Sequence, residues 1–234
     1  MPLSLRSLRP GDRPALIPIK RRERSWGARG CAQVGGTTAR REVRALRYLA
    51  DMPSSGAQDM RLARPAVALV ASYLDFLDEL AARGERVWPA RPEPTETSET
   101  LVARLLRAEA APDPPRVPQT TYWATVGEAV VGHIGLHHRL SAELTELGGH
   151  IGYTVRPSYR ARGLAKEMLR QVLRTAKAQE IGRLLLTCAP DNAASNRTIR
   201  ANGGVLERTI FVERIARATN LYWITLSCDG HAAT

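Results

Sequence analysis

Three arginines and a glycine stand where a strand-like segment turns into an amphipathic helix, and this combination suits phosphate chemistry. Residues 153–169 read YTVRPSYRARGLAKEML. Pro157 disfavours helix at the preceding residue and donates no hydrogen bond, so we expect the strand to end at Val155 and the helix to begin near Gly163. The first amides of a helix lack partners within it and the helix dipole is positive there, so such an end binds anions.

The residue types of this turn predict a diphosphate ligand. Gly163 lets a ligand approach the backbone because it has no Cβ, and Ala165 keeps the first turn small. Arg160 and Arg162 can pair with phosphate oxygens, although a basic helix end exposed to solvent would look the same. Neither the G-x-G-x-x-G fingerprint of dinucleotide sites nor the G-K-[ST] of a P-loop is present. The residues expected to hold the diphosphate are Arg160, Ala161, Arg162, Gly163, Leu164 and Ala165.

Two motifs resemble those of the GCN5-related N-acetyltransferase (GNAT) family. Arg160-x-x-Gly163-x-Ala165 is similar to its R/Q-x-x-G-x-G/A signature, and DNAASNRTIRANGG at 191–204 is similar to its second landmark, N-x-x-S/A before a helix and a glycine. The resemblance covers roughly residues 60–228 and is most specific over 148–207. The stretches GGHIGYTVRPSYRARGLA, NGGVLE and YWI look like a bacterial branch of predicted acetyltransferases.

The resemblance implies acetyl-coenzyme A as co-substrate and a place for each of its parts. The loop amides would hold its pyrophosphate, and the pantetheine would enter between two splayed strands, 148–155 and 183–189. Asn192 and Ser195 would bond the amides of the pantetheine, although turn formation and N-capping explain both residues equally well. The main-chain wall for the thioester would be Tyr153, Thr154 and Val155.

The implied reaction is direct attack of a primary amine, on a small molecule or peptide, upon the thioester. We place His150 first as the base, because a histidine pKa suits proton removal near neutrality. His137, His138, Glu143 and Glu146 are the other candidates.

The proton donor to the sulfur is harder to assign from the sequence. Ile199 stands where many relatives have a tyrosine, four residues after Ser195. Tyr153 and Tyr222 are the available phenols, and otherwise water protonates the thiolate.

Two other classes of function are open at this stage. Because Ile199 replaces the tyrosine, the domain could be a degenerate acyl-coenzyme A sensor without turnover. Because residues 1–59 hold 12 of the 34 Lys and Arg but 5 of the 23 Asp and Glu, they could be a basic arm for nucleic acid, although disorder or an early start codon, with Met60 as the true start, is favoured. A metal site at His133, His137, His138 and His150 lacks carboxylate or cysteine ligands at a recognisable spacing, so we expect none.

The composition bounds the class of protein. Of 234 residues 44% are hydrophobic, so a core can form. No apolar run reaches the roughly 18–20 residues of a membrane span, and the N-terminus lacks the apolar segment of a signal peptide. Cys31, Cys188 and Cys228 are few and widely spaced. These features lead us to expect a cytoplasmic protein without disulfides.

The pattern of elements predicts an α/β (α+β) fold with a mixed, mostly antiparallel twisted sheet. The resemblance adds splayed central strands flanked by helices. We expect a basic extension at 1–59, an acetyltransferase domain at 60–228 and a tail at 229–234. Trp88, Trp123 and Trp223 are expected to be core rather than pocket residues. The expected elements are helices at 65–85, 98–110, 163–179 and 193–204, a hairpin at 120–138 around Gly127, and strands at 148–157, 183–189 and 221–227.

Overall fold

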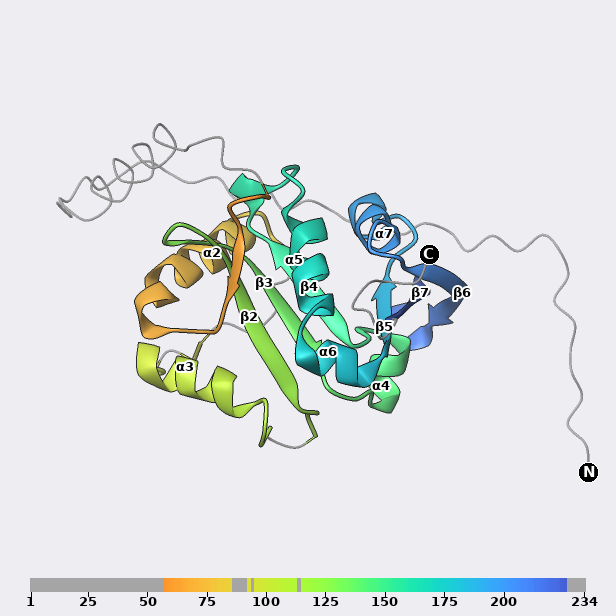
Figure 1. Ribbon diagram of the computed structural model, residues 1–234, viewed down its shortest axis with the longest axis horizontal. Helices are drawn as coiled ribbons and strands as arrows, with labels where there is room; N and C mark the ends of the chain where they lie inside the picture. Colours follow the sequence, from red (N-terminus) through yellow and green to blue (C-terminus); the bar gives the residue numbers. More distant parts are fainter. Residues whose placement is uncertain (1–56, 86–91, 94, 113–114, 227–234) are drawn as a thin grey trace, which may run out of the picture. The chain divides into compact units, whose positions relative to one another are not determined.

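The computed structural model describes residues 57–85, 92–93, 95–112 and 115–226 (Figure 1). Short 3-10 turns precede α2, follow β4 and precede β7. The strands are β1 (Arg61–Ala63), β2 (Gln119–Val126), β3 (Ala129–His137), β4 (Ile151–Val155), β5 (Arg183–Cys188), β6 (Val205–Val212) and β7 (Arg217–Thr225). The helices are α2 (Val70–Ala82), α3 (Ser98–Arg107), α4 (Ala142–Glu146), α5 (Leu164–Leu173), α6 (Ala176–Ile181) and α7 (Ala193–Arg200).

The strands form two sheets that meet between β4 and β5. One sheet has the order β1-β2-β3-β4 and the other the order β5-β7-β6, with antiparallel pairing throughout. Outside the ladders, a single bridge between Gly149 and Leu186 joins the sheets among the described residues. The predicted fold class is therefore confirmed, and β4 and β5 form the splayed pair (Figure 1).

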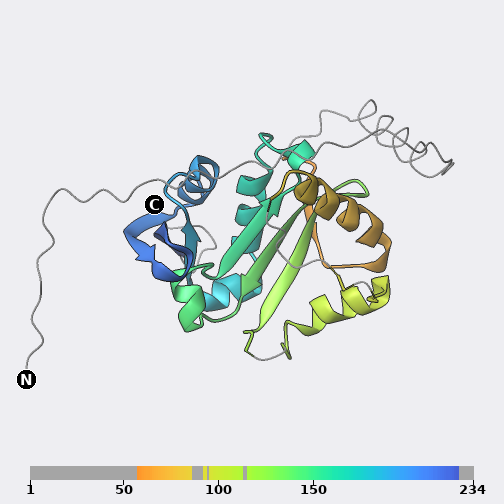
Figure 2. The ribbon, with the colours of Figure 1, turned by 180° about the vertical axis from the view of Figure 1, so that it is seen from behind.

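Helices cover both faces of the four-stranded sheet. On β2, Ala124 belongs to the core that also holds Met168 and Leu169 of α5, whereas Trp123 belongs to the core formed with α2 and α3. Successive strand residues point to opposite faces, so α5 and α2 lie on opposite sides, as Figures 1 and 2 show. Trp123 is fully buried and stacks on Tyr73, with ring centroids 4.4 Å apart, as the core expectation requires.

The helix expected at 163–179 is two helices, so this prediction was wrong in its extent. α5 ends at Leu173 and α6 begins at Ala176. Thr175 causes the break, because its hydroxyl donates to the Val172 carbonyl at 2.7 Å and accepts the amide of Ala178 at 3.3 Å as an N-cap. β1, α4 and β6 were not predicted, and the last strand begins at Arg217 rather than at 221.

Several sequence predictions fall on parts of the chain that the structure does not describe. Trp88, Cys31 and Cys228 lie outside the described residues, as do residues 1–56 of the predicted basic extension. Residues 57–59 are described, and Met60 is a buried core residue. Within the described part of the chain no helix is long and apolar enough to cross a bilayer.

Candidate functional site

The loop before α5 is a backbone cradle without a side-chain cap. Gly163 is the N-cap of α5 and has a left-handed backbone with φ of 77°, and no side chain caps the first turn. Ala161 also has positive φ, 62°, so the loop turns sharply twice within three residues. Among the described residues, a Cβ added at Gly163 would meet only the Cβ of Ala57, 3.7 Å away. The amides at the start of α5 therefore face open space with the positive helix end behind them.

The arginines of the loop are engaged with protein groups. Arg160 donates to both carboxylate oxygens of Glu85, at 2.7 and 2.6 Å, and to the Val155 carbonyl at 3.1 Å. Arg162 donates to the Ser158 carbonyl at 3.2 Å and lies over the ring of Tyr159. Both predicted phosphate ligands thus border the cradle, but their guanidinium groups shape the loop in this structure.

Helix α2 braces the cradle through two glutamates that sequence reasoning missed. Glu79 accepts from the buried Arg156 at 2.6 Å and from both the amide and the hydroxyl of Ser158 at 3.1 Å. Glu85, just after α2, holds Arg160. The available signal was charge complementarity alone, two acidic residues near a helix end and an arginine-rich loop far along the chain.

The edge of β4 presents unpaired backbone groups to the gap before β5. The bonds His137 N–H to His150 O and Arg156 N–H to Val131 O set the alternation of the ladder with β3. Residues 152 and 154 share that side, so the amide and carbonyl of Tyr153 point the other way, into the gap. Of the three main-chain residues predicted to line the thioester, Tyr153 and Val155 therefore face the gap, whereas the amide of Thr154 is used in the sheet.

The second predicted motif forms the start of α7. The side chain of Asn192 caps the helix by accepting the amide of Ser195 at 3.0 Å. This is the capping role that the sequence allowed for both residues. Asn196, which was not predicted, donates to the carbonyls of Ala189, Pro190 and Asn192 and fixes the loop after β5.

The two candidate phenols differ in their surroundings. The hydroxyl of Tyr222 donates to Asn196 Oδ1 at 2.5 Å. The buried hydroxyl of Tyr153 lies near Ser195 and Thr198 of α7, but no hydrogen bond of ordinary geometry joins it to a described residue. Burial raises the pKa of Tyr153 to about 12. A buried donor without a partner at the edge of the gap is suited to a ligand acceptor.

His150 joins the two sheets. Its amide donates to the Leu185 carbonyl at 2.7 Å, and its Nδ1 accepts the Leu185 amide at 2.8 Å. The residue is 6% exposed, and burial lowers its pKa to about 4. Because Nδ1 is the acceptor, the neutral ring carries its proton on Nε2. In this arrangement neither ring nitrogen is free to take a proton.

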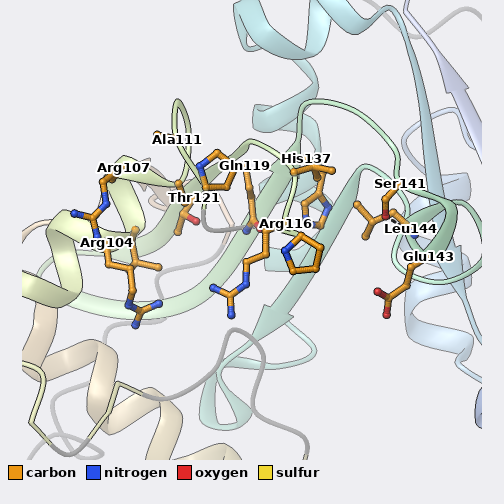
Figure 3. A pocket seen from close by; sticks show the side chains of 15 residues that line it. Arg104, Arg107, Ala111, Arg116, Gln119, Thr121, His137, Ser141, Glu143 and Leu144 are labelled. Carbon is orange, nitrogen blue, oxygen red and sulfur yellow. Dashed lines mark hydrogen bonds between the residues drawn. The ribbon is translucent and has the colours of Figure 1, made fainter.

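A pocket of about 350 Å³ lies on the face of the sheet covered by α3 (Figure 3). Its walls come from α3 and the segment that follows it, from the paired ends of β2 and β3, and from the start of α4. His137, Gln119 and Thr121 point into it from the sheet, and Arg104, Arg107 and Arg116 stand opposite Ser141 and Glu143. Within the described residues no group of three or more His, Cys, Asp or Glu could hold a metal.

A split sheet beside an uncapped, glycine-started helix is the arrangement that the sequence resemblance implies for acetyl transfer. A family model described as "Acetyltransferase (GNAT) domain" matches residues 67–205, more than half of the chain. The chain therefore belongs to the GNAT acetyltransferase family, which confirms the predicted family and enzyme class. None of the curated proteins matches the sequence.

Solved acetyltransferases share the fold. The microcin C7 self-immunity acetyltransferase MccE, solved with acetyl-CoA and AMP, is 14% identical, with 72% of this chain and 93% of that one covered and a TM-score of 0.53. The Salmonella typhimurium enzyme that modifies the N-terminal serine of ribosomal protein L7/L12 is 18% identical, with coverages of 75% and 98% and a TM-score of 0.54. The ribosomal-protein-S5-alanine acetyltransferase of Vibrio fischeri is 16% identical, with coverages of 71% and 91% and a TM-score of 0.51. At these identities the likeness is one of fold.

Proposed function

We propose that this protein is an acetyl-CoA-dependent N-acetyltransferase that moves the acetyl group directly to a primary amine of a small molecule or peptide. The observation that carries the proposal is the cradle at Gly163, whose exposed amides lie beside the gap between β4 and β5. Family membership supports the reaction class, and the presence of acetyl-CoA in the MccE structure supports the co-substrate. The acceptor amine stays open between small molecules and peptides.

The described residues divide the work of holding the co-substrate. The amides of the loop and of the first turn of α5 suit a diphosphate, because they point to solvent and lack internal partners. The gap-facing amide and carbonyl of Tyr153 can pair with an extended arm as a neighbouring strand would. Asn192 and Ser195 stand across the gap at the start of α7.

In the transfer itself the amine nitrogen forms a bond to the thioester carbon, the carbon–sulfur bond breaks, and the sulfur leaves as a thiolate. The Tyr153 hydroxyl supplies a hydrogen bond to this sulfur. With a pKa of about 12 it remains protonated, since a thiol has a pKa of only about 8.5. Water then protonates the thiolate, so the transfer proceeds without the tyrosine that Ile199 replaces. Ile199 itself is 1% exposed and belongs to the core.

The cradle is tested by Gly163→Val with Gly127→Val as its matched control. Both glycines have positive φ, 77° and 56°, and both have open space around them, but Gly127 lies in the distant β2–β3 turn. Acetyl-CoA affinity is measured by calorimetry and transfer by thiol release with a panel of amines. We expect Gly163→Val to weaken binding at least about tenfold, or 1.4 kcal/mol, while Gly127→Val binds as the wild type does.

Each outcome of this experiment decides something. Normal binding by Gly163→Val would refute the placement of the diphosphate. Binding by the wild type without thiol release for any amine would favour the acyl-coenzyme A sensor over the enzyme. Arg160→Ala should cost less than Gly163→Val, because backbone amides provide most of the grip and an exposed charge contact is worth about 0–1 kcal/mol.

A further inference from the structure

We propose that His137 is the general base of the transfer and that the pocket between α3, α4 and the ends of β2 and β3 holds the acceptor amine. This inference rests on the proposed acetyltransferase function. It moves the base from His150, the first choice from sequence, to the histidine that closes β3. The argument combines a hydrogen-bond direction, a position in the fold and an open wall of a pocket.

The hydrogen bond of His137 leaves one ring nitrogen available as a base. Its Nδ1 lies 3.1 Å from the carbonyl oxygen of Gly149. A carbonyl can only accept, so Nδ1 carries the proton, and in the neutral ring Nε2 keeps a lone pair. His150 has the opposite arrangement, because its Nδ1 accepts the Leu185 amide. Of these two neighbouring histidines, His137 therefore has the tautomer that a base requires, and the Gly149 carbonyl holds its ring in place.

The position of His137 connects the pocket with the gap that would admit the thioester. Gly149, its hydrogen-bond partner, forms the bridge to Leu186 at the point where β4 and β5 part. His137 is paired with Gln119 across the β2–β3 ladder and shares the face of Trp123, the face that α2 and α3 cover. An amine in the pocket would thus approach the apex of the gap from the face opposite α5. This arrangement puts the acceptor and the cradle on different sides of the sheet.

The electrostatic setting keeps His137 neutral near pH 7. Burial is the main cause of its lowered pKa, the Gly149 carbonyl acts the other way, and His138 lowers it further. The charged groups on the pocket wall are Arg104, Arg107, Arg116 and Glu143. Of these, Arg104 pairs with Glu96 and Glu143 pairs with Arg214. In the step itself, Nε2 takes one proton from the attacking nitrogen, and the imidazolium then releases it to water at the pocket mouth.

The test uses His137→Asn, which separates basicity from positioning. The asparagine amide can replace Nδ1 as donor to the Gly149 carbonyl, while nothing replaces Nε2. His138→Gln is the matched control, because its ring bonds Thr120 and lies outside the pocket wall. Acetyl-CoA affinity is measured by calorimetry and kcat/KM by thiol release. Since the wall carries three arginines and one glutamate, primary amines that also bear a carboxylate or phosphate are the first acceptors to test.

We expect His137→Asn to bind acetyl-CoA as the wild type does and to lose about 10²–10⁴-fold in kcat/KM for a primary amine. The remaining rate should rise with pH as the free amine supplies its own lone pair. With hydroxylamine, which is unprotonated at neutral pH, the loss should be less than about tenfold, and His138→Gln should keep activity with both acceptors.

Two results would overturn the assignment of the base. One is wild-type kcat/KM with primary amines in His137→Asn, and the other is an equal loss with hydroxylamine and primary amines, which indicates a structural defect. A wild type that binds acetyl-CoA but acetylates nothing would instead refute the proposed function, so the two failures are distinguishable.

Discussion

Replacement of Gly149 by alanine should loosen the junction between the two sheets. Gly149 has φ of +67°, and a Cβ added there would stand 2.4 Å from the Leu185 carbonyl oxygen. Left-handed alanine costs about 1–2 kcal/mol. Ordinary contacts of a Cβ begin at 3.4 Å, so the strands must also move apart by about an ångström. That movement would break the two bonds between His150 and Leu185, each worth about 1 kcal/mol.

We therefore expect Gly149→Ala to lower the free energy of unfolding by about 3–4 kcal/mol. Urea unfolding of this variant is compared with that of Gly127→Ala, whose glycine also has positive φ but no neighbour within 4 Å. The control carries only the cost of the left-handed backbone, so the two variants should differ by about 2 kcal/mol. Equal losses in the two variants would refute the close contact of β4 with β5 at Gly149.

Two further outcomes follow from the charges and buried rings. Glu85→Gln should weaken acetyl-CoA binding two- to fivefold if Arg160 braces the loop, because an exposed pair is worth about 0–1 kcal/mol, and tighter binding by calorimetry would show that Arg160 is a phosphate ligand. Burial lowers the pKa of His150 to about 4 and of His133 to about 3, whereas both titrate near 6.5 when unfolded. Their contribution is full above pH 6.5 and is lost as pH falls toward 4, so the free energy of unfolding should fall by about 2–3 kcal/mol between pH 7.5 and 5.5. Urea unfolding at the two pH values checks this, and an unchanged free energy would contradict the burial of neutral rings.

The position of the cradle could be predicted from the sequence because local rules decide it. Pro157 ends the strand, Gly163 accepts the left-handed conformation, and the apolar spacing after it defines one face of α5. The hairpin around Gly127 follows from similar local signals, and its register pairs Val126 with Ala129. In both places the residues that fix the backbone lie within a few positions of the feature.

β6 and the α5–α6 break show where such rules fail. β6 lies at the edge of its sheet, and Val205 and Phe211 are 69% and 59% exposed, so its residues lack the alternation of a half-buried strand. Its identity as a strand depends on pairing with β7, which no local window contains. The break at Thr175 did carry a local signal, the N-cap itself, but the apolar spacing continues across it and favoured one helix.

The roles of single side chains were the least predictable, because they depend on contacts far along the chain. Both histidines near the gap have the right residue type for a base, and only the direction of one hydrogen bond separates His137 from His150. Arg160 has the right charge for phosphate, but 75 residues separate it from Glu85, which holds it in place. With Glu85 on one side and the Val155 carbonyl on the other, the Arg160 side chain ties the end of β4 to the end of α2. The free donors left at the cradle are then main-chain amides, and their accessibility is set by the absence of a side chain at Gly163 rather than by the charge around it.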